Sequence, residues 1–190
     1  MGWMPEGDDV LYNTNQRAGK AGYGVRRIRY LGAKSRLVYV ATPRGLYRSH
    51  DGGETFSRIQ LPGGYEANDV RDVVFEPKSN KRMWAGTSIG LFHSEDGGQH
   101  FNKVPGRAGH TPILSIWTGV VQEEELILLG TEEGVMRSWN GGASFHDLLL
   151  QGVGAYEPVH VVAFDPRGEI TYAGATKGLF VSERGQTILE

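Results

Sequence analysis

The chain has 190 residues, a net charge of −2, 28 glycines and no cysteine. A near-neutral charge argues against a broad electrostatic surface for nucleic acid or anionic membrane. The lack of cysteine excludes disulfides and thiolate chemistry. No apolar run approaches the ~18 residues of a membrane helix, and the acidic residues 1–10 lack the apolar core of a signal peptide. The sequence therefore predicts no membrane span, and it leaves the compartment unknown.

Taken in chain order, the predicted elements repeat. The runs are short, rich in β-branched and aromatic residues, and separated by glycine and proline, which is typical of β-strands. First strands are expected at 25–30, 70–75, 113–118 and 159–164, second strands at 38–42, 83–87, 127–131 and 171–175, and third strands at 46–49, 91–94, 135–138 and 179–182. A fourth strand follows in the first three units, at 56–61, 101–104 and 145–150.

Between the third and fourth strands lies a recurring glycine-rich box. It reads SHDGGETF from Ser49, SEDGGQHF from Ser94, SWNGGASF from Ser138 and, in a degenerate copy, SERGQTI from Ser182. The spacings are 45, 44 and 44 residues. A fixed period near this length is that of a four-stranded propeller blade.

The box resembles the Asp-box, or BNR repeat, with the pattern Ser/Thr-x-Asp-x-Gly-x-Thr-Trp/Phe. Its aspartate is expected to accept backbone hydrogen bonds within a tight turn, which is a structural role. In the third copy asparagine takes that position, and in the fourth copy Arg184 does. The matching residues are Ser49, Asp51, Gly53, Thr55, Phe56, Ser94, Asp96, Gly98, Phe101, Ser138, Asn140, Gly142, Phe145, Ser182 and Gly185.

The resemblance implies an all-β propeller, as in sialidases, sortilin-type receptors and photosystem II assembly factors. We expect one domain over 1–190 with blades at 25–61, 70–104, 113–150 and 159–190, and residues 9–13 as a candidate strand that closes the last blade. Four blades are few for a propeller. Three arrangements stay open, namely a two-chain, eight-bladed ring, a small ring within one chain, and an arc completed by another protein.

In propellers of this class, ligands bind the rim formed by the loops that enter each blade and the loops between second and third strands. The polar and aromatic residues expected there are Tyr23, Arg26, Arg44, Tyr65, Arg71, His110, Tyr156 and His160. Glycoside hydrolysis would need two carboxyl groups on this rim. The weak candidates for that role are Asp72, Glu132, Glu133 and Glu157, with Asp69 beside them.

The sequence favours a non-catalytic interaction or assembly module whose partner is another protein or a second copy of the chain. The alternative is a carbohydrate-active enzyme, sialidase-like or otherwise, or a sugar-binding domain. The arginine, Tyr–Glu and Arg-Ile-Pro set of sialidases is incomplete, because Arg29 follows Arg27 and Ile28 where proline is expected. No metal-ligand spacing or nucleotide motif occurs, so no cofactor, metal or nucleic-acid partner is predicted. Enzymatic activity stays an open question.

Overall fold

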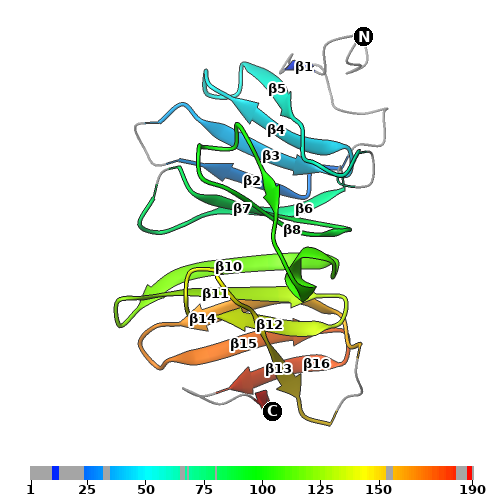
Figure 1. Ribbon diagram of the computed structural model, residues 1–190, viewed down its shortest axis with the longest axis vertical. Helices are drawn as coiled ribbons and strands as arrows, with labels where there is room; N and C mark the ends of the chain where they lie inside the picture. Colours follow the sequence, from blue (N-terminus) through cyan, green and yellow to red (C-terminus); the bar gives the residue numbers. More distant parts are fainter. Residues whose placement is uncertain are drawn as a thin grey trace.

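The computed structural model describes residues 10–12, 24–31, 35–64, 67, 69–79, 81–152, 156–182 and 188–189. Their regular structure consists of short β-strands and the 3-10 helix η2 (Arg107–Gly109). No helix in these ranges is long and apolar enough to cross a membrane. Figure 1 shows the strands gathered into sheets along the longest axis of the molecule, with the blue-to-green half of the chain in the upper part of the view and the green-to-red half in the lower part.

We number the sheets in chain order. Sheet 1 holds β2 (Arg27–Tyr30), β3 (Val38–Thr42), β4 (Gly45–Ser49) and β5 (Thr55–Ile59), and sheet 2 holds β6 (Val70–Phe75), β7 (Met83–Thr87), β8 (Gly90–Ser94) and β9 (Asn102–Lys103). Sheet 3 holds β10 (Ile113–Val121), β11 (Glu124–Thr131), β12 (Gly134–Ser138) and β13 (His146–Leu150), and sheet 4 holds β14 (Val159–Asp165), β15 (Ile170–Ala175) and β16 (Gly178–Ser182).

Two short strands extend the outer edges of these sheets. β1 (Val10–Tyr12) pairs antiparallel with β5 in sheet 1, and β17 (Ile188–Leu189) pairs parallel with β13 in sheet 3. Residues 9–13 were expected to close the last blade, yet the described part of this segment lies beside β5 and not beside β16. Its role as a closing strand stays a prediction about a complete ring.

The core lies between successive sheets, because side chains alternate between the two faces of a strand. We call the face toward the preceding sheet the front and the other the back. Val73 and Phe75 on the front of sheet 2 pack against Tyr39 on the back of sheet 1, and the rings of Tyr39 and Phe75 meet edge-on at 5.2 Å. The two following junctions hold similar apolar clusters.

A column of small residues lets adjacent sheets approach closely. A β-carbon at Gly86 would lie 2.6 Å from Cγ2 of Ile113, the first residue of the next sheet, and one at Gly130 would lie 2.6 Å from the carbonyl oxygen of Val159. Glycine is therefore required at these two positions by close packing.

Sheet 3 differs from the predicted pattern. Its first hairpin is longer than the repeat suggests, since β10 runs to Val121 and β11 begins at Glu124. Gln122 and Glu123 form the turn, with φ of 48° and 71°. Two successive left-handed residues are typical of the type I′ turn, which matches the twist of the flanking strands.

Candidate functional site

The glycine-rich boxes lie at one end of the sheets and repeat the same hydrogen bonds. The serine hydroxyl accepts the amide of the second glycine in the first three copies, with donor–acceptor distances of 2.8, 2.8 and 2.9 Å for Ser49, Ser94 and Ser138. The acidic or amide side chain accepts the amide four residues later, at 2.9 Å for Asp51, 2.9 Å for Asp96 and 3.0 Å for Asn140.

The bonding in the first box stabilises the charged form of its aspartate. Hydrogen bonds from Ser49 and Thr55 hold the pKa of Asp51 well below its usual range. These partners are all used to close the turn, as expected for a structural element. Gly185, in the degenerate fourth copy, lies outside the described residues.

The opposite end of the sheets forms the rim. In sheets 2, 3 and 4 a backbone hydrogen bond joins the hairpin to the entering loop of its own sheet, from the amide of Ser88 to the carbonyl of Asp69 at 3.1 Å, from Glu132 to Pro112 at 3.1 Å and from Thr176 to Pro158 at 3.2 Å. A register shift at the start of β6, β10 and β14 leaves Arg71, Leu114 and His160 as the extra residues. Such bulges redirect a side chain out of the strand alternation.

A chain of ion pairs crosses the rim from sheet 1 to sheet 3. Arg26 lies 2.8 Å from Asp69, Asp69 lies 3.4 Å from Arg71, and Arg71 lies 2.6 Å from Glu132. The Arg71 side chain is 17% exposed, whereas that of Arg26 is 41% exposed. Three of the predicted rim and carboxylate residues thus meet, with Asp69 as the link between the arginines.

Asp72, which is buried beneath this series of ion pairs, has a structural role. Its carboxylate accepts Nε of Arg27 at 3.0 Å and the amide of Ile116 at 2.9 Å, and it is 1% exposed. It therefore ties sheets 1, 2 and 3 together. Both oxygens have internal partners, so Asp72 is poorly positioned to transfer a proton to a ligand.

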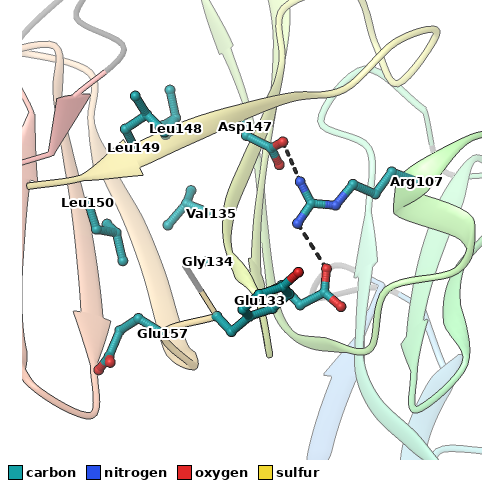
Figure 2. A pocket seen from close by; sticks show the side chains of 10 residues that line it. Arg107, Glu133, Gly134, Val135, Asp147, Leu148, Leu149, Leu150 and Glu157 are labelled. Atoms are coloured by element: carbon teal, nitrogen blue, oxygen red, sulfur yellow. Dashed lines mark hydrogen bonds and ion pairs between the residues drawn. The ribbon is translucent and has the colours of Figure 1, made fainter. Parts of the chain in front are cut away.

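A pocket of about 220 Å³ opens beside β12 and β13, between the hairpin of sheet 3 and the entering loop of sheet 4 (Figure 2). Arg107 from η2 reaches between Glu133, at 2.9 Å, and Asp147, which it also contacts directly. The hydrogen bond that Arg107 donates to the Glu133 carboxylate raises the pKa of Arg107. Leu148, Leu149 and Leu150 supply apolar lining, together with Val135, Tyr156 and Glu157.

The remaining predicted rim residues surround this pocket or lie apart from it. Tyr156 is 71% exposed and has a positive φ of 72°, which is uncommon for tyrosine. Buried Glu157 accepts the Lys177 amide at 2.7 Å, and His160 contacts Thr176 at 3.0 Å. The His110 ring contacts the Gly106 carbonyl oxygen of its own loop at 2.9 Å, and Arg44 lies in the hairpin of sheet 1. Tyr23 and Tyr65 lie outside the described residues.

Arg107 and Asp147 were missed by the sequence reasoning. Arg107 sits inside the entering loop of sheet 3, a position that could have been noted, but Asp147 is an ordinary member of an outer strand. Their pairing joins positions 40 residues apart, so no local pattern indicates it.

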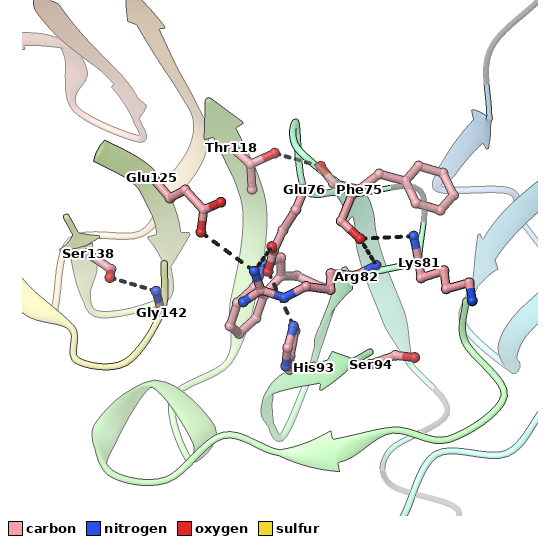
Figure 3. Close-up of polar contacts among 12 residues, drawn as sticks. Phe75, Glu76, Lys81, Arg82, His93, Ser94, Thr118, Glu125, Ser138 and Gly142 are labelled. Atoms are coloured by element: carbon pink, nitrogen blue, oxygen red, sulfur yellow. Dashed lines mark hydrogen bonds and ion pairs between the residues drawn. The ribbon is translucent and has the colours of Figure 1, made fainter. Parts of the chain in front are cut away.

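A second polar cluster is buried between sheets 2 and 3 (Figure 3). Glu76 accepts Nε1 of Trp84 at 3.0 Å and lies 2.8 Å from Arg82 and 3.3 Å from His93. The imidazole stacks on the indole at 4.1 Å. Glu76 thus lies against one indole N–H, one guanidinium and one imidazole, and these contacts stabilise the junction. Across the described ranges, no group of three or more His, Cys, Asp and Glu could hold a metal ion.

Comparisons with known proteins address the fold. No family model matches the chain, and no curated protein matches it. Among solved structures, the chain is similar to an ancestral GH74 enzyme (24% identity, TM-score 0.71, 87% of this chain and 23% of that one). It is also similar to the extracellular domain of a hybrid two-component system from B. thetaiotaomicron (17%, 0.66, 95% and 25%) and to YCF48 bound to D1 peptide (18%, 0.57, 87% and 52%).

The chain therefore spans about a quarter of the first two structures and about half of YCF48. These similarities establish a β-propeller-like, all-β fold. The similar structures include a glycoside hydrolase, the extracellular domain of a two-component system and a peptide-bound protein. One fold thus hosts several activities, and function has to be argued from the rim.

Proposed function

We propose that this chain is a non-catalytic interaction module of the Asp-box propeller class, with its sheets as blades, its boxes as structural turns and its rim as a binding surface for a protein segment. The observation that carries the proposal is the pairing of the rim carboxylates. Asp69 and Glu132 lie against Arg71, Glu133 against Arg107, and Glu157 against Lys177. A general acid or nucleophile needs a carboxyl group available to the substrate.

The exposed parts of the rim suit a peptide. Arg26 and Arg107 keep 41% and 48% of their side chains exposed, and Tyr156 presents a largely free ring. Arginine and tyrosine combine apolar area with hydrogen bonding and are frequent anchors at interfaces. Paired charges of both signs favour a polypeptide with mixed side chains over a polyanion. YCF48, a structural neighbour, is described as bound to a peptide.

An array of random-sequence peptides tests this proposal. We expect a family of peptides to be enriched by the chain and lost with Arg26→Ala and Tyr156→Ala. Arg36→Ala is the matched control, because Arg36 is an exposed arginine bonded to Asp51 and Glu54 at the box end. Enrichment that survives both rim substitutions would refute binding at the rim.

Carbohydrate binding is the second candidate, favoured by the pocket. Glu133 and Glu157 both line it beside the exposed ring of Tyr156, and aromatic rings offer apolar faces to sugars. The GH74 neighbour is an enzyme of the glycoside hydrolase class. Titration with a panel of plant-polysaccharide oligosaccharides, followed by calorimetry and product analysis, distinguishes the candidates. Cleavage that is lost in Glu133→Gln or Glu157→Gln would replace the peptide-binding proposal with a hydrolase.

A further inference from the structure

On the front face of sheet 1, Val40 and Tyr47 are buried, but the residues on and just before β2 are exposed although they have the apolar character of a buried surface. Equivalent positions in the four sheets share one chemistry, so each can be compared with its counterparts. Val25 is 56% exposed, whereas its counterparts Val70, Ile113 and Val159 are all 0% exposed. Each of these three packs in the junction with the preceding sheet.

The next front-facing position repeats this contrast. Ile28 is 57% exposed, whereas Val73, Ile116 and Val162 are buried against the sheet before them. Tyr30, two residues further along β2, is exposed as well. Along β2, the front of sheet 1 thus carries apolar residues of a junction that no sheet among the described residues covers.

The back face of sheet 4 also carries an exposed apolar residue at a position that is buried in the other sheets. Leu179 is 66% exposed, whereas its counterparts Leu46, Leu91 and Val135 are at most 2% exposed. Gly174 keeps the small column of Gly86 and Gly130. A β-carbon there would meet only its own sheet, through Val161. At Gly86 and Gly130 the missing side chain lets the next sheet approach closely. At Gly174 no described sheet makes that approach.

The two open faces complement each other in detail. At the first internal junction, Tyr39 from a back face meets Phe75 from a front face, and the Tyr39 hydroxyl donates to the carbonyl of Gly97 in the next box at 2.9 Å. Tyr172 occupies the Tyr39 position on the back of sheet 4, and Tyr30 occupies the Phe75 position on the front of sheet 1. An aromatic pair is thus available across the open ends.

We propose that the back face of sheet 4 binds the front face of sheet 1 of a second copy of this chain, and that two such contacts close a two-fold ring of eight sheets. This deepens the proposed interaction function by naming a partner for the chain. Continuity with the internal junctions is the reason to choose a second copy, because each chain carries both halves of one more junction. Two equivalent contacts satisfy two-fold symmetry and leave no apolar face open.

Native mass spectrometry of the 190-residue chain across a dilution series tests the ring. We expect a dimer of twice 20.9 kDa, and monomers for Leu179→Asp and Ile28→Asp with unchanged circular dichroism, because both side chains are exposed in the single chain. Leu149→Asp is the matched control, since Leu149 is 64% exposed on internal sheet 3. A wild-type monomer, a ladder of higher oligomers, or equal dissociation of the control would overturn the proposal.

Crosslinking tests the contact without relying on dissociation. The chain has no cysteine, so Tyr30→Cys with Tyr172→Cys introduces a single defined pair. A short bismaleimide should link these variants into a covalent dimer, whereas Tyr30→Cys with Glu95→Cys, at the exposed box end, should not crosslink. Equal crosslinking of both pairs would contradict the ring. Tyr156→Ala should leave the mass at the dimer value, so failure of peptide binding and failure of the ring are observed separately.

Discussion

The two ends of the sheets differ in how far their side-chain contacts repeat from one sheet to the next. At the box end, three copies close the same serine and aspartate or asparagine hydrogen bonds with nearly equal distances. At the rim, a backbone hydrogen bond repeats in sheets 2, 3 and 4, but the side chains of each sheet form different contacts. Arg71 pairs with Glu132, Arg107 with Glu133 and Asp147, and His160 with Thr176. Repetition marks the residues that hold the scaffold, and variation marks the surface where recognition can differ between sheets.

The largest effect is expected where the repeated scaffold brings sheets together. Gly130→Val would place a β-carbon 2.6 Å from the Val159 carbonyl, which forces sheets 3 and 4 apart. Overpacking of this kind typically costs about 1–3 kcal/mol and here should reach the upper end of that range. Urea unfolding measures the loss.

Gly174→Val is the matched control for that substitution. It lies in the same column, but its new side chain would meet only Val161 of its own sheet. Both substitutions should be compared in the monomeric Leu179→Asp background, so that the proposed dimer contact does not cover Gly174. Equal destabilisation by the two changes would show that the glycine column does not serve sheet-to-sheet packing.

The next largest effect concerns the box serines. Ser94→Ala removes a buried acceptor of the Gly98 amide and a donor to Asp96. Leaving a buried donor without its partner costs about 1–3 kcal/mol. Ser138→Ala should cost a similar amount, because its bonds to Gly142 and Asn140 are equivalent. Unequal losses of unfolding free energy, measured in urea, would show that the boxes do not contribute equally to stability.

A smaller effect should depend on pH. Because the folded pKa of Asp51 lies well below the ordinary value of about 3.9, its contribution is complete above that value. It is lost as pH falls below that value toward the depressed folded pKa. Asp51→Asn should flatten this acid dependence, and the reciprocal Asn140→Asp should steepen it. Urea midpoints compared at neutral pH and near pH 3 measure both changes, and parallel curves for all variants would contradict the assignment.

The smallest effect on stability is expected at the rim. Arg71→Ala breaks contacts with Asp69 and Glu132, and partly exposed ion pairs of this kind contribute about 0–1 kcal/mol. Peptide capture should nevertheless fall sharply, because Arg71 positions Asp69, which pairs with the exposed Arg26. Unfolding free energy reports on the scaffold, and peptide capture reports on the rim surface. A large loss of stability with intact peptide capture would show that Arg71 belongs to the scaffold and not to the binding surface.

The sequence predicted the scaffold better than the rim, for physical reasons. The bounds 38–42, 83–87 and 171–175 anticipated β3 and β7 fully and most of β15, because alternation and glycine punctuation are local signals. The β10–β11 hairpin was longer than expected, since its extension depends on a turn rather than on the repeat. Arg71 and Glu132 are 61 residues apart, and their pairing follows only from how sheets 2 and 3 meet.

The short reach of the box hydrogen bonds has a consequence for biosynthesis. Every bond made by Ser49 or Asp51 within its box spans at most four residues, and each sheet pairs only consecutive strands before its outer additions. Contacts of low sequence separation form quickly. Each unit can thus begin to fold as it leaves the ribosome, and it presents a finished face on which the following unit assembles. The order of translation then becomes the order in which these sheets stack.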